Sequence, residues 1–437
     1  MLRAEARSGT HPEGTRRAPR PAGTVSLELL VILVPVIFGL MGFAIDLGRL
    51  YLIRAELQTA ANAMALAAAG ELIGTELSGE YAAAAAKAVL DSESGYGNRY
   101  NFGGTPLGTT TGMLSSEVPD PALYETLAAA LESGEEGESS TASGATAKYA
   151  KVNVTADAPL LFWSFLPLGI ERKTQVRVQA VAGISPPLCT ACGIEPLVIA
   201  PIDPEETIDF GYTLNTKYTF YYQCSGTAPA ALVGTRVPYL VLNRYNEEAQ
   251  VFADEGTQLF RIGAQGLIPS TNPGVSCVKV SASGTAEEGD VVWQSLMPAA
   301  CTANPPAGIT ALLCGMWTRF DASLPEGCTS IPEVDSFQAY QADTDLADSE
   351  EYATYTGNAR RVITVPIVES LSSTDAMIVL GFRQFLLEPN PNDTNVNPQD
   401  ADGRFVALYI GSVVPLKQGR FDGCQLATGP GKVVLHQ

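Results

Sequence analysis

The cysteines carry the clearest potential for chemistry in this chain of 437 residues, which has eight of them. Cys189 and Cys192 are separated by two residues, a spacing found in thiol–disulfide enzymes and in zinc sites. A redox pair should begin a helix after a strand, but Pro186, Pro187 and Pro196 flank this one. A zinc site would need a second ligand pair, and no histidine is near. We therefore favour structural disulfides, with redox and metal roles left open and the pairing undetermined, among the candidates Cys189, Cys192, Cys224, Cys277, Cys301, Cys314, Cys328 and Cys424.

A second group of candidates is the oxygen-rich stretch 390–403, with the weak metal candidates Asp393, Asp400 and Asp402. Calcium prefers about six to eight oxygen ligands, whereas Asp400 to Gly403 is only a fragment of a calcium loop with no glutamate at the expected distance. We predict a solvated turn and no cofactor, with Ca²⁺ as the alternative. The acidic run Asp343–Glu351 is likewise predicted to be a solvated face.

Catalytic constellations are missing from the sequence. The two histidines, His11 and His436, stand at opposite ends of the chain, so no Ser-His-Asp or Cys-His pair is expected. No Gly-x-x-x-x-Gly-Lys-[Ser/Thr] string marks a nucleotide site, and no two carboxylates stand out as an acid–base pair. We expect neither enzymatic activity nor a nucleotide ligand.

An apolar run near the N-terminus could anchor the rest of the chain in a membrane. Val25–Ile45 contains 21 residues, enough for a helix to cross the roughly 30 Å core of a bilayer. Five arginines precede the run, against only two glutamates, which places the N-terminus in the cytoplasm by the positive-inside rule. A cleaved signal peptide is the alternative, but the small-residue sites near Ala61 lie too far downstream.

The charge of the chain divides at the same place. Its formal net charge is −20, while the first 23 residues are basic. An acidic body argues against nucleic-acid partners and suits a domain outside the cytoplasm. The sequence therefore predicts a single-pass protein of a bacterial inner membrane with its C-terminal domain extracytoplasmic, and with a possible place in a surface pilus.

Glu28 interrupts the apolar run, and a carboxylate inside a membrane span usually has a partner. It stands five residues after Gly23, and this Gly-x-x-x-x-Glu pattern resembles the type IV prepilin motif. The resemblance implies cleavage between Gly23 and Thr24, after which the new amine pairs with Glu28 of a neighbouring subunit. An uncleaved anchor with Glu28 at the cytoplasmic interface is the alternative.

The helix is predicted to continue beyond the membrane to about Leu72. Apolar residues recur there at three- and four-residue steps, and Pro35 predicts a kink inside the span. We expect this seam to pack against neighbouring helices, with the packing residues Leu50, Leu57 and Met64.

Two strings in this region resemble the N-terminal segment of TadE/TadG-like proteins of the tight-adherence (Tad/Flp) pilus machinery. They are Ala44-Ile45-Asp46-Leu47-Gly48-Arg49-Leu50-Tyr51 and Arg54-Ala55-Glu56-Leu57-Gln58-Thr59-Ala60-Ala61-Asn62-Ala63. A weaker likeness extends to residues 360–368, 378–382 and 403–406. The resemblance implies a pseudopilin-like subunit or envelope component, with the membrane and other pilus or pseudopilin subunits as partners. No Asp-x-Ser-x-Ser string is present, so a von Willebrand-type metal site is not expected.

The remaining patterns predict an α+β protein with four parts. These are a basic cytoplasmic leader (1–23), the transmembrane and extended amphipathic helix (24–72), a small α+β region with an acidic loop (73–185), and a β-rich, disulfide-containing domain (186–437). Pro121–Leu131 is predicted to be a short helix capped by Asp120. The apolar run Pro159–Leu168 is predicted to be core or hairpin, with a membrane or partner contact as the alternative. Helical patterns are scarce after residue 186, where a sandwich or mixed β domain is expected.

These observations lead to one functional expectation and one alternative. The chain is expected to be a structural or assembly component of a bacterial Tad pilus system, as a minor pseudopilin or an envelope assembly protein. The alternative is a membrane-tethered surface adhesin or binding module, with calcium as a possible ligand. A thiol–disulfide enzyme would require Cys189 or Cys192 to be reactive.

Overall fold

A computed structural model describes the chain from residue 22 onward, with gaps. The described residues are 22–90, 101–102, 105–106, 115–132, 142–162, 173–195, 197–223, 227–241, 260, 263–264, 277–280, 307–320, 325, 327–329, 342–372, 377–388, 395–421, 424 and 426–436. The predicted leader up to residue 21 and the acidic loop at 133–141 therefore lie outside them.

Helix α1, Ala22–Gly70, confirms the predicted long apolar N-terminal helix. Its 49 residues extend over about 73 Å, more than twice the thickness of a bilayer core. The helix continues through Pro35. Among the described residues it is the one helix long and apolar enough to cross a membrane, by length and composition. A membrane-spanning part therefore leaves a second part of similar length to pack on the rest of the protein.

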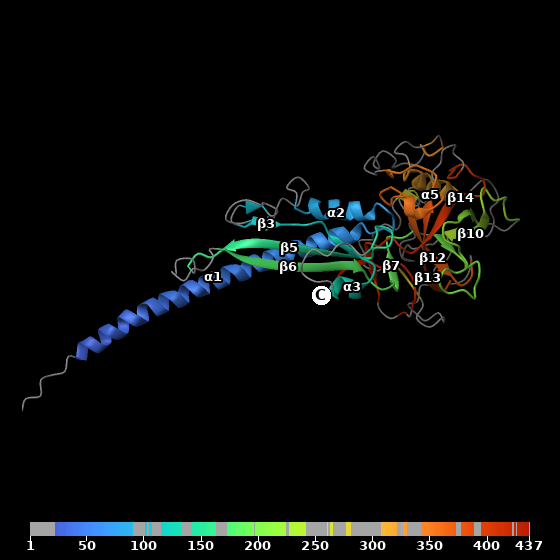
Figure 1. Ribbon diagram of the computed structural model, residues 1–437. Helices are drawn as coiled ribbons and strands as arrows, with labels where there is room; N and C mark the ends of the chain where they lie inside the picture. Colours follow the sequence, from blue (N-terminus) through green and yellow to red (C-terminus); the bar gives the residue numbers. More distant parts are fainter. Residues whose placement is uncertain are drawn as a thin grey trace, which may run out of the picture.

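An antiparallel sheet covers that second part of α1 (Figure 1). Its strands run in the order β16-β6-β5-β3, and β4 also pairs with β5. Alternate residues of β5, among them Val152, Val154 and Ala156, are buried against α1, as their period of two predicts. The bounds are β3 Ser115–Glu117, β4 Ala122–Tyr124, β5 Tyr149–Pro159, β6 Lys173–Ile184 and β16 Val433–His436. The last strand of the chain thus returns to the sheet of the N-terminal region.

Two short helices accompany this sheet. Helix α2, Ser78–Ala88, packs on α1, and helix α3, Leu127–Glu132, follows β4. The predicted helix Pro121–Leu131 is therefore wrong in its first half, which pairs with β5 as strand β4. Thr126 caps α3 by accepting the backbone N–H of Ala129 at 3.3 Å. Asp120, the predicted cap, instead pairs with Lys87 at 2.6 Å on the surface.

A closed barrel of six strands forms the far end of the molecule, in the order β10-β8-β12-β13-β14-β9. Most pairs are antiparallel, but β9 with β10 and β8 with β12 are parallel. Aromatic rings fill the interior, where Phe220 and Phe405 stack with centroids 4.7 Å apart. The β-rich character is as predicted, while the sandwich is replaced by a barrel. The strands are β8 Leu197–Ile199, β9 Lys217–Tyr222, β10 Thr235–Val241, β12 Val362–Val368, β13 Val379–Leu387 and β14 Phe405–Gly411.

Smaller elements complete this end of the chain. Helix α5, Ala307–Trp317, packs into the barrel core and has apolar residues around its whole circumference. A small antiparallel sheet has the order β11-β7-β15, with the bounds β7 Thr190–Cys192, β11 Cys277–Lys279 and β15 Gln418–Arg420. Among the described residues, the remaining elements are a 3₁₀ turn, Tyr352–Thr354, and, in the N-terminal region, the pair β1 (Asn101–Phe102) with β2 (Thr105–Pro106). We call the barrel, α5 and the small sheet together the head.

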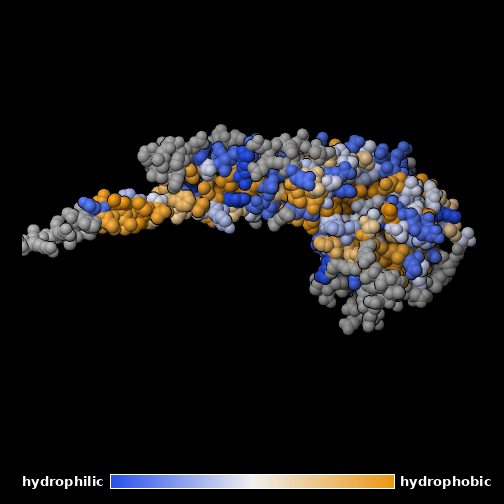
Figure 2. Space-filling model, turned by 60° about the horizontal axis from the view of Figure 1, so that its bottom comes forward, coloured by the Kyte–Doolittle hydropathy of each residue, from blue (hydrophilic) through white to orange (hydrophobic). Residues whose placement is uncertain are grey.

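The elements form a rod with the head at one end (Figure 1). The sheet and α2 lie along the C-terminal half of α1, while the N-terminal half projects alone. The space-filling view shows this projecting part as a hydrophobic cylinder (Figure 2). Separate cores serve the two regions, one between α1 and the sheet and one inside the head.

Candidate functional site

The projecting part of α1 is the first element of the candidate site. From Glu28 to Met41 every residue is exposed, including Leu30, Ile32 and Phe38 at 58–69%. Such a surface is unfavourable in water and suits lipid or other apolar helices. Glu28 is the one charged residue in this exposed part. Gly23 and Thr24 lie in the first turn of α1, so the predicted processing site precedes the exposed segment directly.

The β5–β6 strand pair meets α1 at the end of this exposed part. Asp46 is buried, with 4% of its surface exposed, and its two carboxylate oxygens accept the backbone N–H groups of Leu161 and Phe162 at 2.9 and 3.0 Å. A Cβ atom on Gly42 would lie 2.7 Å from Cβ of Phe162, so only glycine permits this close approach. A buried carboxylate is thereby satisfied by two charge-assisted hydrogen bonds, which hold the end of β5 to the helix.

The residues expected on a seam between neighbouring helices have a different neighbour in this structure. Leu57 and Met64 are completely buried against the chain's own sheet, and Leu50 packs partly against the same core. Gln58 adds a hydrogen bond at 2.8 Å to the backbone oxygen of Gln179 on β6. A second chain cannot reach these side chains while the sheet is in place. The surface left for another helix is the exposed part before Gly42 and the exposed face of α1 that continues from it to Leu52.

The apolar run Pro159–Leu168 was expected to be core or hairpin. Its described part ends at Phe162, and the remainder lies outside the described residues. Pro159 is buried, but Leu161 and Phe162 are 43% and 48% exposed. These two side chains are therefore not core residues, because they lie beyond the end of β5, where the sheet no longer covers them. We call Leu161 and Phe162, which are the residues of the connection after Pro159 whose side chains are exposed in the described part, the hairpin tip.

The six cysteines in the described part of the chain form three disulfides, and none of these joins the Cys-x-x-Cys residues to each other. The pairs are Cys189–Cys424, Cys192–Cys277 and Cys314–Cys328. Cys224 and Cys301 lie outside the described residues. Cys192 and Cys277 face each other across β7 and β11, and Cys189 precedes β7 directly. The disulfides of Cys189 and Cys192 therefore join the start of the head to segments that are 235 and 85 residues away in sequence.

The oxygen-rich loop is organised around an arginine. Both carboxylate oxygens of Asp400 accept hydrogen bonds from Arg404, the shortest at 2.8 Å, and Asp402 lies 3.8 Å from the same guanidinium group. Asp400 also accepts the backbone N–H of Asp402. Among the described residues no group of His, Cys, Asp and Glu could hold a metal ion, and Asp393 lies outside them. The carboxylate pair that we considered for calcium thus faces a fixed positive charge.

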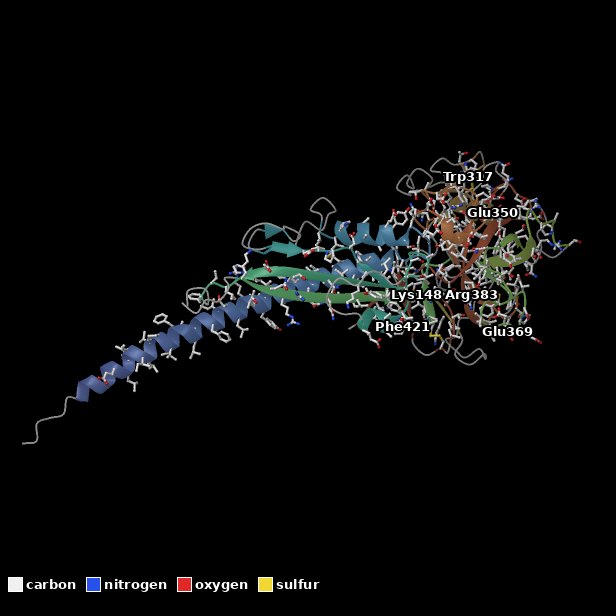
Figure 3. All side chains as sticks on the ribbon, in the orientation of Figure 1. Lys148, Trp317, Glu350, Glu369, Arg383 and Phe421 are labelled. Atoms are coloured by element: carbon white, nitrogen blue, oxygen red, sulfur yellow. A yellow bond between two sulfur atoms is a disulfide. The ribbon has the colours of Figure 1, made fainter. Side chains whose placement is uncertain are left out.

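The head contains buried charges that the sequence patterns did not single out. Glu388 is fully buried, and burial together with a hydrogen bond that its protonated carboxyl donates to Asp348 raises its pKa to about 8. Lys217 bridges the two carboxylates, at 2.6 Å from Asp348 and 3.6 Å from Glu388. Arg383, labelled in Figure 3, is buried in the head and lies over the ring of Phe210 with its guanidinium carbon 4.5 Å from the centroid.

The acidic run 343–351 is only partly the solvated face that we expected. Asp343 is 5% exposed and accepts hydrogen bonds from the Tyr355 hydroxyl and, at 3.0 Å, from the backbone N–H of Arg361. Asp348 keeps 62% of its side chain exposed. The first acid of the run is therefore part of the internal framework, because the buried Arg361 segment must have its polar groups satisfied.

Comparison with known proteins adds one match. Residues 23–71 match a family described as "Putative Flp pilus-assembly TadE/G-like". The matched residues are those of α1, so the resemblance drawn from the sequence is confirmed for the N-terminal helix. No curated protein and no solved structure matches the chain.

Proposed function

Because α1 is a TadE/G-like pilus-assembly segment, we propose that this protein is a membrane-anchored, pseudopilin-like subunit of a Tad pilus assembly system. The first part of α1 would lie in a bacterial inner membrane with its N-terminus in the cytoplasm. The sheet and the head would project on the opposite side. On that side, the second half of α1 and the sheet packed on it would hold the head at a fixed distance from the lipid.

The division of α1 into two halves carries this proposal. Its second half is locked to the sheet by buried residues such as Leu57, while its first half is exposed and apolar over at least Glu28–Met41. A soluble protein would not leave such a surface in water. A subunit that moves between a membrane and a helical assembly needs this surface, because lipid and the helices of other subunits are equally apolar.

Glu28 and the bond between Gly23 and Thr24 supply the assembly step of the proposal. Cleavage there would release the basic leader and create an amine at Thr24, four residues from Glu28 and about one helical turn away. Pairing of this amine with Glu28 of a second subunit would neutralise two charges in lipid, where an unpaired charge is costly. Enzymatic activity, a metal and a cofactor form no part of the proposal.

The test is pilus assembly by cells that carry a Glu28→Ala variant, with Glu56→Ala as the matched control. Glu56 is exposed on the same helix but lies beyond the apolar part. We expect Glu28→Ala to reach the membrane in normal amounts and to abolish co-purification with other pilus subunits, while Glu56→Ala behaves as the unmodified chain.

Mass and N-terminal sequence of the membrane-purified protein complete the test. A mature start at Thr24 would support a processed subunit. Normal assembly by Glu28→Ala, together with a start at Met1, would overturn the proposed pairing and leave a permanent anchor.

A further inference from the structure

The hairpin tip touches α1 inside the predicted membrane span. Phe162 lies against Gly42, whereas the apolar run extends to Ile45. Along a helix, Gly42 is about 6 Å before Asp46, the residue that binds the backbone of the tip. The paired strands β5 and β6 end at Pro159 and Lys173, where Arg49 donates a hydrogen bond to the backbone oxygen of Pro159 at 3.5 Å. The residues that follow β5 thus continue along α1 and reach the end of the apolar run.

The length of the span places this contact at the boundary of the bilayer. Glu28 and Asp46 are the charged residues at the two ends of the exposed apolar part, and they are about 27 Å apart along the helix axis. This distance is close to the roughly 30 Å of a hydrocarbon core. With the apolar run Val25–Ile45 in the hydrocarbon core, Glu28 lies just inside one boundary and Asp46 lies at the other, so that Gly42 and Phe162 lie slightly inside the lipid.

The side chains at this level have the chemistry of a membrane interface. Leu161 and Phe162 are 43% and 48% exposed, and on α1 Phe43 and Leu47 are 46% and 54% exposed. Tyr51, about 7 Å beyond Asp46, is 74% exposed. Tyrosine and tryptophan are enriched where headgroups meet hydrocarbon, because their apolar ring and polar end are both accommodated there, and Tyr51 has this character. The other four side chains are wholly apolar and suit the hydrocarbon just inside that boundary.

We propose that the hairpin tip, Leu161 and Phe162, is a second membrane contact, inserted into the lipid leaflet on the side of the head. The inference rests on the proposed membrane anchoring of α1. Asp46 makes the insertion possible, because it satisfies the two backbone N–H groups of the tip that lipid could not. A single helix can rotate about its axis in a bilayer, whereas a helix with an adjacent inserted tip has one face fixed. The tip therefore sets the rotation and tilt of the rod.

The experiment uses the full chain reconstituted in vesicles of phosphatidylcholine and phosphatidylglycerol. A nitroxide label on Leu161→Cys reports on the tip, one on Val36→Cys on the span, and one on Thr155→Cys on the part of β5 nearer the head. The unmodified chain, treated with the same reagent, controls for labelling of native cysteines. Accessibility to oxygen and to a water-soluble nickel chelate is then measured for each label.

We expect the label at position 161 to resemble that at position 36, with high access for oxygen and low access for the chelate. Adding Phe162→Ser should shift it toward the water-exposed pattern of position 155. A tip label that the chelate reaches as readily as position 155 would overturn the inference. Low access for both reagents would also overturn it, because the tip would then contact another protein. Only if position 36 is open to the chelate does the membrane anchoring itself fail.

Discussion

Removal of the Asp46 carboxylate should detach the hairpin tip from α1. In the variant Asp46→Ala, the backbone N–H groups of Leu161 and Phe162 lose acceptors at 2.9 and 3.0 Å. A hydrogen bond to a charged group contributes about 1.5–3 kcal/mol, so the two together hold the tip with at least about 3 kcal/mol. Since about 1.4 kcal/mol corresponds to a tenfold change in an equilibrium constant, opening of the tip should become on the order of 100-fold more frequent. Asp46→Asn keeps one acceptor oxygen and should show an intermediate effect.

Hydrogen–deuterium exchange of the full chain in detergent micelles measures this opening. The amides of Leu161 and Phe162 should exchange about 100-fold faster in Asp46→Ala, while those of Val152 and Val154, in the middle of β5, should be unchanged. Equal acceleration along the whole of β5 would show that Asp46 stabilises the entire sheet. No acceleration at the tip would refute the reasoning, because the two hydrogen bonds would then contribute nothing to docking.

Two further predictions concern stability. Leu57→Ala should lower the free energy of unfolding by about 2–5 kcal/mol, because Leu57 is fully buried under the sheet. The control Leu52→Ala changes a side chain that is 65% exposed and should alter the free energy of unfolding by less than about 0.5 kcal/mol. Chemical denaturation in detergent measures both variants, and equal effects would contradict the packing of Leu57. Glu388 has a pKa raised from 4.5 to about 8, so its contribution to stability is present below pH 4.5 and is lost as pH rises through about 8. Glu388→Gln should remove a slope of about 1.4 kcal/mol per pH unit within that window, and an unchanged slope would assign it to other groups.

Patterns of local period predicted the elements that pack on one face. The 21-residue apolar run and the seam that follows it gave α1, and the alternating residues around Val152 gave β5. Both signals arise because one face of an element is buried and the other is not. Helix α5 was missed for the opposite reason. Most of its side chains are buried in the core of the head, so its apolar residues show no helical period.

Long-range partners could not be predicted in the same way. Asp46 was part of a recognised family string, yet its role depends on the amides of Leu161 and Phe162, 115 and 116 residues away. The disulfide Cys189–Cys424 likewise spans 235 residues. The sequence gives the type of each group, whereas the partner follows from the path of the chain. The parallel pairs that close the barrel are hidden for the same reason.

The position of Asp46 connects these observations. A carboxylate at the end of an apolar run is unfavourable in an isolated helix at a membrane boundary, and it becomes favourable once two backbone N–H groups are brought to it. Those groups come from a strand pair that also buries Leu57 and Met64 on the same helix. The place where the lipid-facing part of α1 ends is therefore also the place where the sheet begins to cover it. A shift of the helix by a few residues relative to the sheet would separate the Asp46 carboxylate from its two donors. It would also leave part of the apolar surface of α1 in water. Under the proposed anchoring, the fold itself would therefore fix the depth of the rod in the membrane.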